Sequence, residues 1–369
     1  MEERVQGELT LPQNYTYADA GVDRHQRVES KKALRNLQET YKHSHYGNVM
    51  RLPYGSIFPI GENTFLDLVI EGVGTKVLLA QLARKYDTIG IDAVAMAVND
   101  VIRSGARPLA IADNIHAQAS EPRLVREWLK GIIRGAAEAE CPVTGGETGD
   151  VAEIIKGLTE NAGFDIVVAS VGRVKRQELI TGKNVKPGDP IIGLASSGLH
   201  SNGVTMARKI LFKQWGGKYE PNDIPDGLDR EIVLETLVPT KIYVKSLLKL
   251  ANEVKVKAAV HITGDAYMKF SNLTNFSPGI GFEFTNFKPQ HIFGLIQKTA
   301  AELGYSISDD EMFKTFNMGW GFGVIVDRTE TDKAIDLLER DGVKPERIGR
   351  VTDKQGVVIE YKSKRLVLT

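Results

Sequence analysis

The sequence contains a single cysteine, Cys141, so no disulfide can form within the chain. This excludes the small secreted domains that disulfides stabilise, and it is typical of a protein that works in a reducing compartment. The chain also lacks an apolar run approaching the ~18–20 residues that a membrane-spanning helix requires. Residues 1–6 lack the apolar segment of a signal peptide. We therefore expect a cytoplasmic protein with no membrane partner.

An excess of charge of either sign is also absent, because 47 Lys and Arg residues balance 47 Asp and Glu residues. Proteins that bind nucleic acid usually carry a basic excess or a basic face, so the charge balance predicts no nucleic-acid partner. With 369 residues, of which 42% are hydrophobic and 25% charged, the chain is long enough for two globular domains.

Strand-like and helix-like segments alternate along the chain, which predicts an α/β (α+β) fold. A cluster of turn residues at 184–189 interrupts this alternation. We interpret it as the junction between an N-terminal domain of residues 1–183 and a C-terminal α+β domain of residues 184–369. Residues 1–16 are polar, and their pattern indicates no function.

The most informative stretch is Val69–Lys76, in which a predicted strand ends at Glu71, a glycine turn follows, and a helix begins. The glycines let a ligand approach the backbone, and the free N–H groups at the start of a helix favour an anion. A carboxylate, bare backbone and a lysine are the parts needed to hold a phosphate with its magnesium ion. Taken alone, these residues fit an ordinary strand–turn–helix junction better. The order Thr75 before Lys76 excludes a Walker A loop.

Residues 87–105 predict a buried helix, because apolar side chains cover every face of its middle. At 100° per residue, Asp92 and Asn99 lie about 20° apart on one face of this helix, roughly 10 Å apart along its axis. Asp100 and Arg103 are neighbours at i,i+3. A buried carboxylate requires a cation, so the partner of Asp100 is either Arg103 or a magnesium ion.

Three further segments place polar groups where a ligand could bind. A predicted strand ends at Asp113, and another runs into Gly145–Asp150, which combines two glycines, a carboxylate and a hydroxyl. The loop Ser196–Gly203 consists mainly of glycine and small polar residues before a predicted helix, as in a phosphate or sugar site. Surface turns often have the same composition, so both interpretations remain open on these residues alone.

Nine motifs occur in a fixed order over roughly residues 15–330. They are Tyr17–Asp23, Glu71–Lys76, Asp87–Asp100, Gly145–Thr148, Lys186–Asp189, Ser196–Gly203, Val238–Val244, His261–Gly264 and Thr315–Gly319. In type and order they resemble the aminoimidazole ribonucleotide synthetase family, the phosphoribosylformylglycinamidine cyclo-ligases of purine biosynthesis. The resemblance favours the ligand-binding interpretation of each segment over a simple turn.

The resemblance implies a homodimer in which each N-terminal domain contributes strands to a shared central β-barrel flanked by helices, with the C-terminal domain packed outside. It also implies a reaction with ATP, Mg²⁺ and a small-molecule ribonucleotide substrate. ATP would phosphorylate the amide oxygen of formylglycinamidine ribonucleotide, and the ribosyl-bearing nitrogen would attack the activated carbon. Phosphate would then leave as the aminoimidazole ring closes. Phosphoryl transfer depends mainly on positioning and on neutralisation of charge by Mg²⁺ and lysine.

Individual roles follow from the same resemblance. Glu71 and Asp100 would bind Mg²⁺, and His261 and His200 would transfer protons near neutral pH. The residues expected to contact ATP are Gly72, Val73, Gly74, Thr75, Lys76, Asp92 and Asp113. Those expected to contact the ribonucleotide are Gly145, Gly146, Glu147, Thr148, Ser196, Ser197, His200, Ser201 and Asn202.

The chain departs from the family pattern at two places. Glu71 stands where the family usually has Asp, and Gly264–Ala266 stands where it has a run of glycines. We expect Asp265, within that second segment, to compensate by supplying part of the coordination of the metal.

Two other functions remain open. One is a small-molecule kinase on the same fold, such as thiamine-monophosphate kinase or selenophosphate synthetase. A selenophosphate synthetase would be expected to have a reactive N-terminal cysteine, whereas the only cysteine here is Cys141. The other is a non-catalytic paralogue that binds nucleotide, which the two departures from the family pattern would suit.

Overall fold

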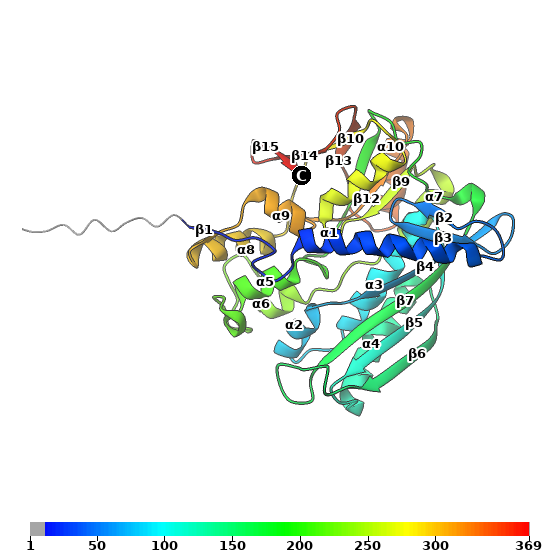
Figure 1. Cartoon of the computed structure of the whole chain (residues 1–369). Coiled ribbons are helices and arrows are strands. Elements are labelled where there is room, and N and C mark those ends of the chain that lie inside the picture. Colours follow the sequence, from blue (N-terminus) through cyan, green and yellow to red (C-terminus); the bar gives the residue numbers. More distant parts are fainter. Residues whose placement is uncertain (1–11, 369) are drawn as a thin grey trace, which may run out of the picture.

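Two mixed β-sheets organise the computed structural model, which describes residues 12–368 (Figure 1). The N-terminal sheet contains, in spatial order, β2 (Met50–Leu52), β3 (Gly55–Pro59), β4 (Thr64–Gly72), β7 (Phe164–Lys175), β5 (Arg107–Ala117) and β6 (Val143–Asp150). The C-terminal sheet contains β15 (Lys364–Leu368), β14 (Val357–Tyr361), β10 (Gly281–Phe284), β13 (Pro345–Thr352), β8 (Pro190–Ala195), β12 (Trp320–Ile325) and β9 (Ala258–His261). The predicted α/β (α+β) class is confirmed.

Helices, 3₁₀ turns and the short strand β11 complete the two halves. The N-terminal half has α2 (Lys76–Leu82), α3 (Ile89–Val101), α4 (Pro122–Ala139) and the short 3₁₀ turns η2 (Ile102–Ser104) and η3 (Arg176–Glu178). The C-terminal half has α5 (Val204–Leu211), η4 (Lys213–Trp215), α6 (Ile232–Thr236), α7 (Val244–Glu253), η5 (Ala266–Asn275), α8 (His291–Glu302), β11 (Tyr305–Ser306), α9 (Asp309–Thr315), η6 (Arg328–Glu330) and α10 (Thr331–Arg340). The predicted domain boundary at residues 183/184 falls between η3 and β8.

Helix α3 is the central element of the N-terminal half and is buried over nearly its whole length, as its apolar sequence predicted. It packs against β4 and β7 on one side and against α4 on the other. The two helices touch at Gly90 and Gly131, where a Cβ added to Gly90 would lie 2.3 Å from the backbone nitrogen of Ile132. Glycine is therefore needed at this crossing, and the close approach fixes α3 against the sheet.

The opposite face of the N-terminal sheet carries exposed apolar side chains. Leu68 and Ile70 of β4 are 61% and 69% exposed. Within residues 12–368 this sheet is open, with β2 and β6 as its edges. A single chain therefore does not close the predicted barrel in the part that the structure describes.

An N-terminal arm, residues 12–43, crosses from one half to the other. Its first strand, β1 (Gln13–Asn14), pairs in parallel with β11 of the C-terminal half. The backbone N–H of Tyr17 and the guanidinium of Arg24 both donate to Glu311 Oε1, at 2.9 and 2.8 Å. Helices α1 (Arg24–Ala33) and η1 (Leu34–His43) then run along the surface without a buried residue (Figure 1).

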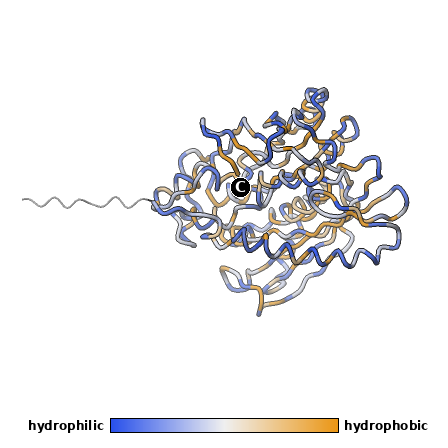
Figure 2. The backbone as a smooth tube through the Cα atoms, turned by 45° about the horizontal axis from the view of Figure 1, so that its top comes forward, coloured by the Kyte–Doolittle hydropathy of each residue, from blue (hydrophilic) through white to orange (hydrophobic). Residues whose placement is uncertain are grey.

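The hydropathy of the chain follows this architecture. Apolar segments run through the middle of the molecule, and hydrophilic segments follow its outer loops (Figure 2). No helix among residues 12–368 has the length and apolar character that crossing a bilayer demands. Residues 1–11 of the polar segment 1–16, whose pattern indicated no function, lie outside the described residues.

Candidate functional site

A cavity of about 640 Å³ is lined by residues of both halves and bordered by α1. Its volume is within the range of small-molecule sites in proteins. The charged residues of its lining are Arg27, Lys31, Asp67, Glu71, Asp100, Arg103, Asp265 and Lys269. Four carboxylates and four cations thus line one cavity, which suits a ligand that carries phosphates and a divalent cation.

The carboxylates of Glu71 and Asp100 lie near each other in this cavity, one at the end of β4 and the other in the last turn of α3. Burial, reinforced by the charge of Asp100, raises the pKa of Glu71 to about 7. Two carboxylates that repel each other in a partly desolvated site are stabilised by a shared cation. The donor set therefore fits Mg²⁺, which proteins often bind through one or two carboxylates together with phosphate oxygens.

Larger ligand clusters are absent from residues 12–368, where no three His, Cys, Asp or Glu side chains are grouped to hold a metal ion. The three residues expected to bind the metal, Glu71, Asp100 and Asp265, therefore do not form such a group in the described part of the chain.

Asp100 is held by two protein groups at once. Its Oδ2 lies 2.8 Å from Arg103 Nη2, and its Oδ1 lies 2.7 Å from His261 Nδ1. Although burial opposes ionisation, the Arg103 guanidinium and the hydrogen bond from His261 hold the pKa of Asp100 well below its usual range. The sequence left either Arg103 or a metal as its partner. The structure shows the Arg103 ion pair and leaves Asp100 an ionised carboxylate at the cavity.

The two histidines expected to transfer protons are enclosed in the protein and do not line the cavity. Burial lowers the pKa of His261 to about 4, despite the hydrogen bond to Asp100. Burial also lowers the pKa of His200 well below its usual value, and its Nε2 accepts from the backbone N–H of Ser197 at 3.1 Å. This differs from the expected proton transfer near neutral pH, because both imidazoles are neutral there and shielded from the cavity.

Lys76 also lies elsewhere than expected. Its Nζ is 2.9 Å from Asp92 Oδ1 and donates to the carbonyl of Val238 at 2.8 Å, and both charged side chains are fully buried. Burial lowers the pKa of Lys76, which Asp92 opposes. The structure therefore places Lys76 and Asp92 in a buried ion pair of the N-terminal half that contacts Val238 of the C-terminal half, not at the cavity where an ATP ligand was expected.

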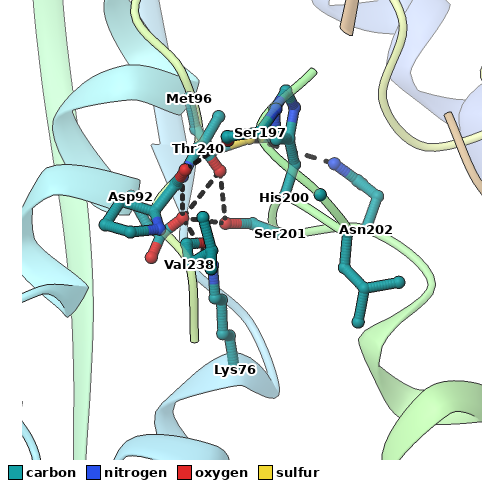
Figure 3. A network of polar contacts seen from close by, with 12 residues as sticks. Lys76, Asp92, Met96, Ser197, His200, Ser201, Asn202, Val238 and Thr240 are labelled. Atoms are coloured by element: carbon teal, nitrogen blue, oxygen red, sulfur yellow. Dashed lines mark hydrogen bonds and ion pairs between the residues drawn. The ribbon is translucent and has the colours of Figure 1, made fainter. Parts of the chain in front are cut away.

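The face of α3 that carries Asp92 and Asn99 forms a polar seam with residues 238–243. Asp92 Oδ1 accepts from the backbone N–H of Thr240 (2.7 Å), from its hydroxyl (2.6 Å) and from Ser201 Oγ (3.0 Å). Figure 3 shows Lys76, Ser201 and Thr240 converging on Asp92. Asn99 donates to the carbonyl of Lys241 (2.8 Å) and accepts from the N–H of Tyr243 (2.9 Å). The prediction that Asp92 and Asn99 share one face is confirmed.

The other residues expected to contact ATP are also outside the cavity lining. None of residues 72–76 lines it: Val73 is buried, and Thr75 Oγ1 lies 2.8 Å from Thr205 Oγ1. Asp113 lies on β5 opposite Gly146 of the edge strand β6 and does not line the cavity. Partial burial raises the pKa of this carboxyl group.

The residues expected to bind the ribonucleotide fall into two separate groups. Gly145–Thr148 belong to the exposed edge strand β6. Ser196–Asn202 lie in the C-terminal half, where Ser197 Oγ donates to the carbonyl of Pro239 at 2.6 Å. Of all the residues in these two groups, Asn202 alone lines the cavity. A single chain therefore does not bring these two segments to one site within the described residues.

Asp265 lines the cavity, in a backbone conformation for which the glycines of the family pattern are suited. Asp265 and Ala266 have φ of +65° and +38°, in the left-handed region that glycine adopts without strain. The carboxylate of Asp265 is 3.5 Å from Nζ of Lys31 on α1. It therefore joins the loop to α1 as well as facing the cavity.

The sequence did not single out four charged residues of the cavity, Arg27, Lys31, Asp67 and Lys269. Asp67 precedes Glu71 by four residues on β4, so the two-residue period of a strand puts both on one face, and that signal was available. Burial raises the pKa of Asp67 to about 6. Lys269 lies in η5 and donates to the carbonyl of His261 (3.3 Å) and to Thr263 Oγ1. Its only sequence signal is a charge between apolar neighbours.

Comparison with known proteins identifies the relatives of the chain. Residues 55–174 match the N-terminal domain of AIR synthase related proteins, and residues 186–362 match the C-terminal domain. The chain is similar to phosphoribosylformylglycinamidine cyclo-ligase of Pyrococcus furiosus, with 36% identity over 352 residues that cover 94% of this chain and 97% of the relative. The protein of the same name from Methanocaldococcus jannaschii is 37% identical over 368 residues, covering 96% and 99%.

The fold agrees with these sequence relationships. The solved structure of tt0281 from Thermus thermophilus has a TM-score of 0.58 at 16% identity, over 88% of this chain and 94% of that chain. At this identity the likeness shows the fold alone, whereas the nearly full-length matches above 30% identity show the family. The chain therefore belongs to the phosphoribosylformylglycinamidine cyclo-ligase family.

Proposed function

We propose that the chain closes the imidazole ring of formylglycinamidine ribonucleotide with ATP, giving aminoimidazole ribonucleotide, ADP and phosphate. Identity of 36% and 37% to two cyclo-ligases over almost the whole chain supports the reaction. The observation that carries the site is the pair of carboxylates, Glu71 and Asp100, facing one cavity of about 640 Å³.

Glu71 and Asp100 would hold Mg²⁺ together with phosphate oxygens of ATP. The metal, when bound, neutralises charge on the phosphates during transfer. Arg103 and His261 orient Asp100 and keep it ionised, so it is ready to bind a cation without losing a proton. Asn202 brings the loop 196–203 to the same cavity.

Ring closure requires that the attacking nitrogen lose a proton. The buried histidines do not suit this step, because burial removes them from the cavity. The carboxyl groups of Asp67 and Glu71 face the cavity with pKa values of about 6 and about 7. A base with a pKa near the operating pH transfers protons most effectively, so Asp67 is the better candidate, since Glu71 is assigned to the metal.

The exposed sheet face supports a homodimer. Leu68 and Ile70 project from β4 into solvent, and the side chains opposite them on β7 and β5 are also apolar. Those neighbours are Val171, Ala169, Ala110 and Ala112. An open sheet with an apolar face and unpaired edges is stabilised by association with a second sheet. We infer that two chains pair through this face, in the cytoplasm and without a nucleic-acid partner.

The decisive experiment supplies purified protein with formylglycinamidine ribonucleotide, ATP and Mg²⁺. ADP release is followed by a coupled assay, and the aminoimidazole product is detected as an aryl amine. We expect one ADP per aminoimidazole ring. ATP consumption without aminoimidazole would refute ring closure and favour the small-molecule kinase. Binding of ATP without turnover would favour the non-catalytic paralogue.

A pair of matched variants ties the activity to the cavity. Glu71→Gln removes a charge at the assigned metal site and should lower kcat/KM about a hundredfold or more, as loss of a group that stabilises transition-state charge does. Glu62→Gln makes the same change at an exposed position in the turn before β4 and should leave activity unchanged. Equal activity of both variants would remove Glu71 from the site.

A further inference from the structure

Lys269 reaches the cavity from the C-terminal half. It lies in η5, which begins directly after the loop 261–265, and its side chain turns back to that loop. Its Nζ donates to two neutral acceptors, the carbonyl of His261 and the hydroxyl of Thr263. These contacts fix the position of the ammonium group and leave its charge uncompensated by direct contact.

The other cations of the cavity either pair with a carboxylate or lie exposed on the surface. Arg103 is paired with Asp100 at 2.8 Å and lies over the ring of Tyr54, with its guanidinium carbon 5.1 Å from the ring centroid. Lys31 is 3.5 Å from Asp265, and Arg27 is exposed on α1. Lys269 has no carboxylate within ion-pair distance among residues 12–368. Lys269 is thus a partly buried cation of this cavity that is available to pair with an anionic ligand.

Four charged groups act on Lys269. Asp100 of α3, Glu71 of β4 and Asp265 of the preceding loop favour its protonated form, whereas Arg103 of η2 opposes it. Removal from bulk water outweighs these carboxylates and lowers the pKa of Lys269 to about 8. An anion bound beside Lys269 would offset this desolvation, and a phosphate held by the nearby metal site is such an anion.

We propose that Lys269 is a catalytic residue of this chain, whose ammonium group binds the transferred phosphoryl group of ATP. The proposal rests on the proposed function and gives Lys269 the role that the sequence suggested for Lys76. The bond between the γ-phosphorus and the β,γ-bridging oxygen breaks, and its electron pair leaves with ADP. The substrate amide oxygen forms the new bond to phosphorus. Lys269 stays protonated and donates hydrogen bonds to the phosphoryl oxygens.

Two variants separate the charge of Lys269 from its packing. Lys269→Met removes the charge and keeps a side chain of similar length, and Lys269→Arg keeps a cation. We expect Lys269→Met to lower kcat/KM for ATP about a hundredfold and Lys269→Arg to retain most of it. Lys354→Met, at an exposed lysine of the C-terminal half, is the matched control and should match the wild type.

Nucleotide selectivity tests the contact without relying on turnover. In calorimetric titrations with Mg²⁺, Lys269→Met should weaken ATP binding about tenfold, as expected for one charge-assisted contact, and leave ADP binding unchanged. This result would support Lys269 even if the wild type formed no aminoimidazole, which would count only against the proposed reaction. Equal losses for ATP and ADP, or no loss for either, would overturn the assignment to the phosphoryl group.

The pH profile provides a readout that a purely structural lysine would not change. Wild-type kcat/KM for ATP should fall as the pH rises above about 8, because Lys269 then loses its proton. In Lys269→Arg this alkaline decline should move to higher pH, since guanidinium stays protonated. If Lys269→Met failed to fold, as judged by circular dichroism, this shift in Lys269→Arg would remain the test. An unmoved decline would refute the proposal.

Discussion

The buried pair of Lys76 and Asp92 yields the sharpest prediction, because the sequence and the structure give Lys76 different roles. A phosphate ligand contributes to ATP binding, whereas a buried ion pair contributes to folding. Lys76→Met removes the ammonium group and leaves the Asp92 carboxylate buried. Loss of one member of a buried pair typically costs about 3–5 kcal/mol of unfolding free energy.

The surroundings of Asp92 place the expected loss near the lower end of that range. Its Oδ1 still accepts from Thr240 N–H, Thr240 Oγ1 and Ser201 Oγ, so part of the negative charge remains solvated by protein donors. We therefore expect a loss of about 3 kcal/mol, a large share of the ~5–15 kcal/mol that stabilises a typical protein.

Urea unfolding followed by tryptophan fluorescence measures this loss as a lower midpoint. The matched control is Lys85→Met, since Lys85 pairs with Asp87 at 2.7 Å but is 41% exposed. An exposed pair contributes less than about 1 kcal/mol, so this control should unfold near the wild-type midpoint. Lys76→Met/Asp92→Asn removes both charges and should recover part of the stability lost in Lys76→Met.

ATP kinetics decide between the two roles. If the buried pair is structural, folded Lys76→Met keeps a KM for ATP close to the wild type. A near-normal urea midpoint together with a KM for ATP raised many-fold would refute this reasoning and return Lys76 to the phosphate site.

Three further predictions concern the cavity and the sheet face. Burial raises the pKa of Asp67 in the folded protein to about 6, above its ordinary value. Between pH ~4 and pH ~6 the folded state therefore binds a proton that the unfolded state has lost. Stability of the ligand-free protein should fall as pH rises through this window, by at most about 1.4 kcal/mol per pH unit, and Asp67→Asn should remove the slope in urea titrations. Leu68→Asp and Ile70→Asp should each yield monomers in sedimentation at low protein concentration. The control Ile224→Asp, at another exposed apolar residue, should remain dimeric. If all three variants remained dimeric, this face of the sheet would be excluded as the dimer interface. Asp265→Gly should weaken binding of Mg²⁺–ATP with a thermal midpoint nearly unchanged, and tighter binding would show that the carboxylate repels phosphate.

Local patterns in the sequence predicted the features that depend on local geometry. The helix carrying Asp92 and Asn99 is buried because apolar side chains cover all its faces, and 3.6 residues per turn place those two residues together. The position of Glu71 near the end of β4 and the ion-pair spacing of Asp100 and Arg103 could also be predicted from the sequence. Each of these features involves residues within a few turns or one strand of each other.

The partners of the charged side chains could not be predicted, because they come from distant parts of the chain. Nothing within Val69–Lys76 shows that Lys76 faces Asp92 and the carbonyl of Val238, 162 residues away along the chain. Likewise, Lys269 reaches the cavity only because the loop before η5 turns it back to Thr263. The family resemblance supplied motifs and a reaction, but it could not say which lysine of this chain meets the cavity.

His261 is buried and contacts Asp100, and this contact gives the histidine motif a structural role. Asp100 is ionised and can only accept, so Nδ1 of His261 must carry the proton in the hydrogen bond of 2.7 Å. With its pKa lowered to about 4, the imidazole is neutral and keeps this tautomer across physiological pH. The C-terminal half therefore fixes the orientation of a carboxylate that belongs to the N-terminal half. Because α3 also binds residues 238–243 through Asp92 and Asn99, one rigid helix sets the position of Asp100 relative to both halves, as a site that must hold metal and phosphate requires.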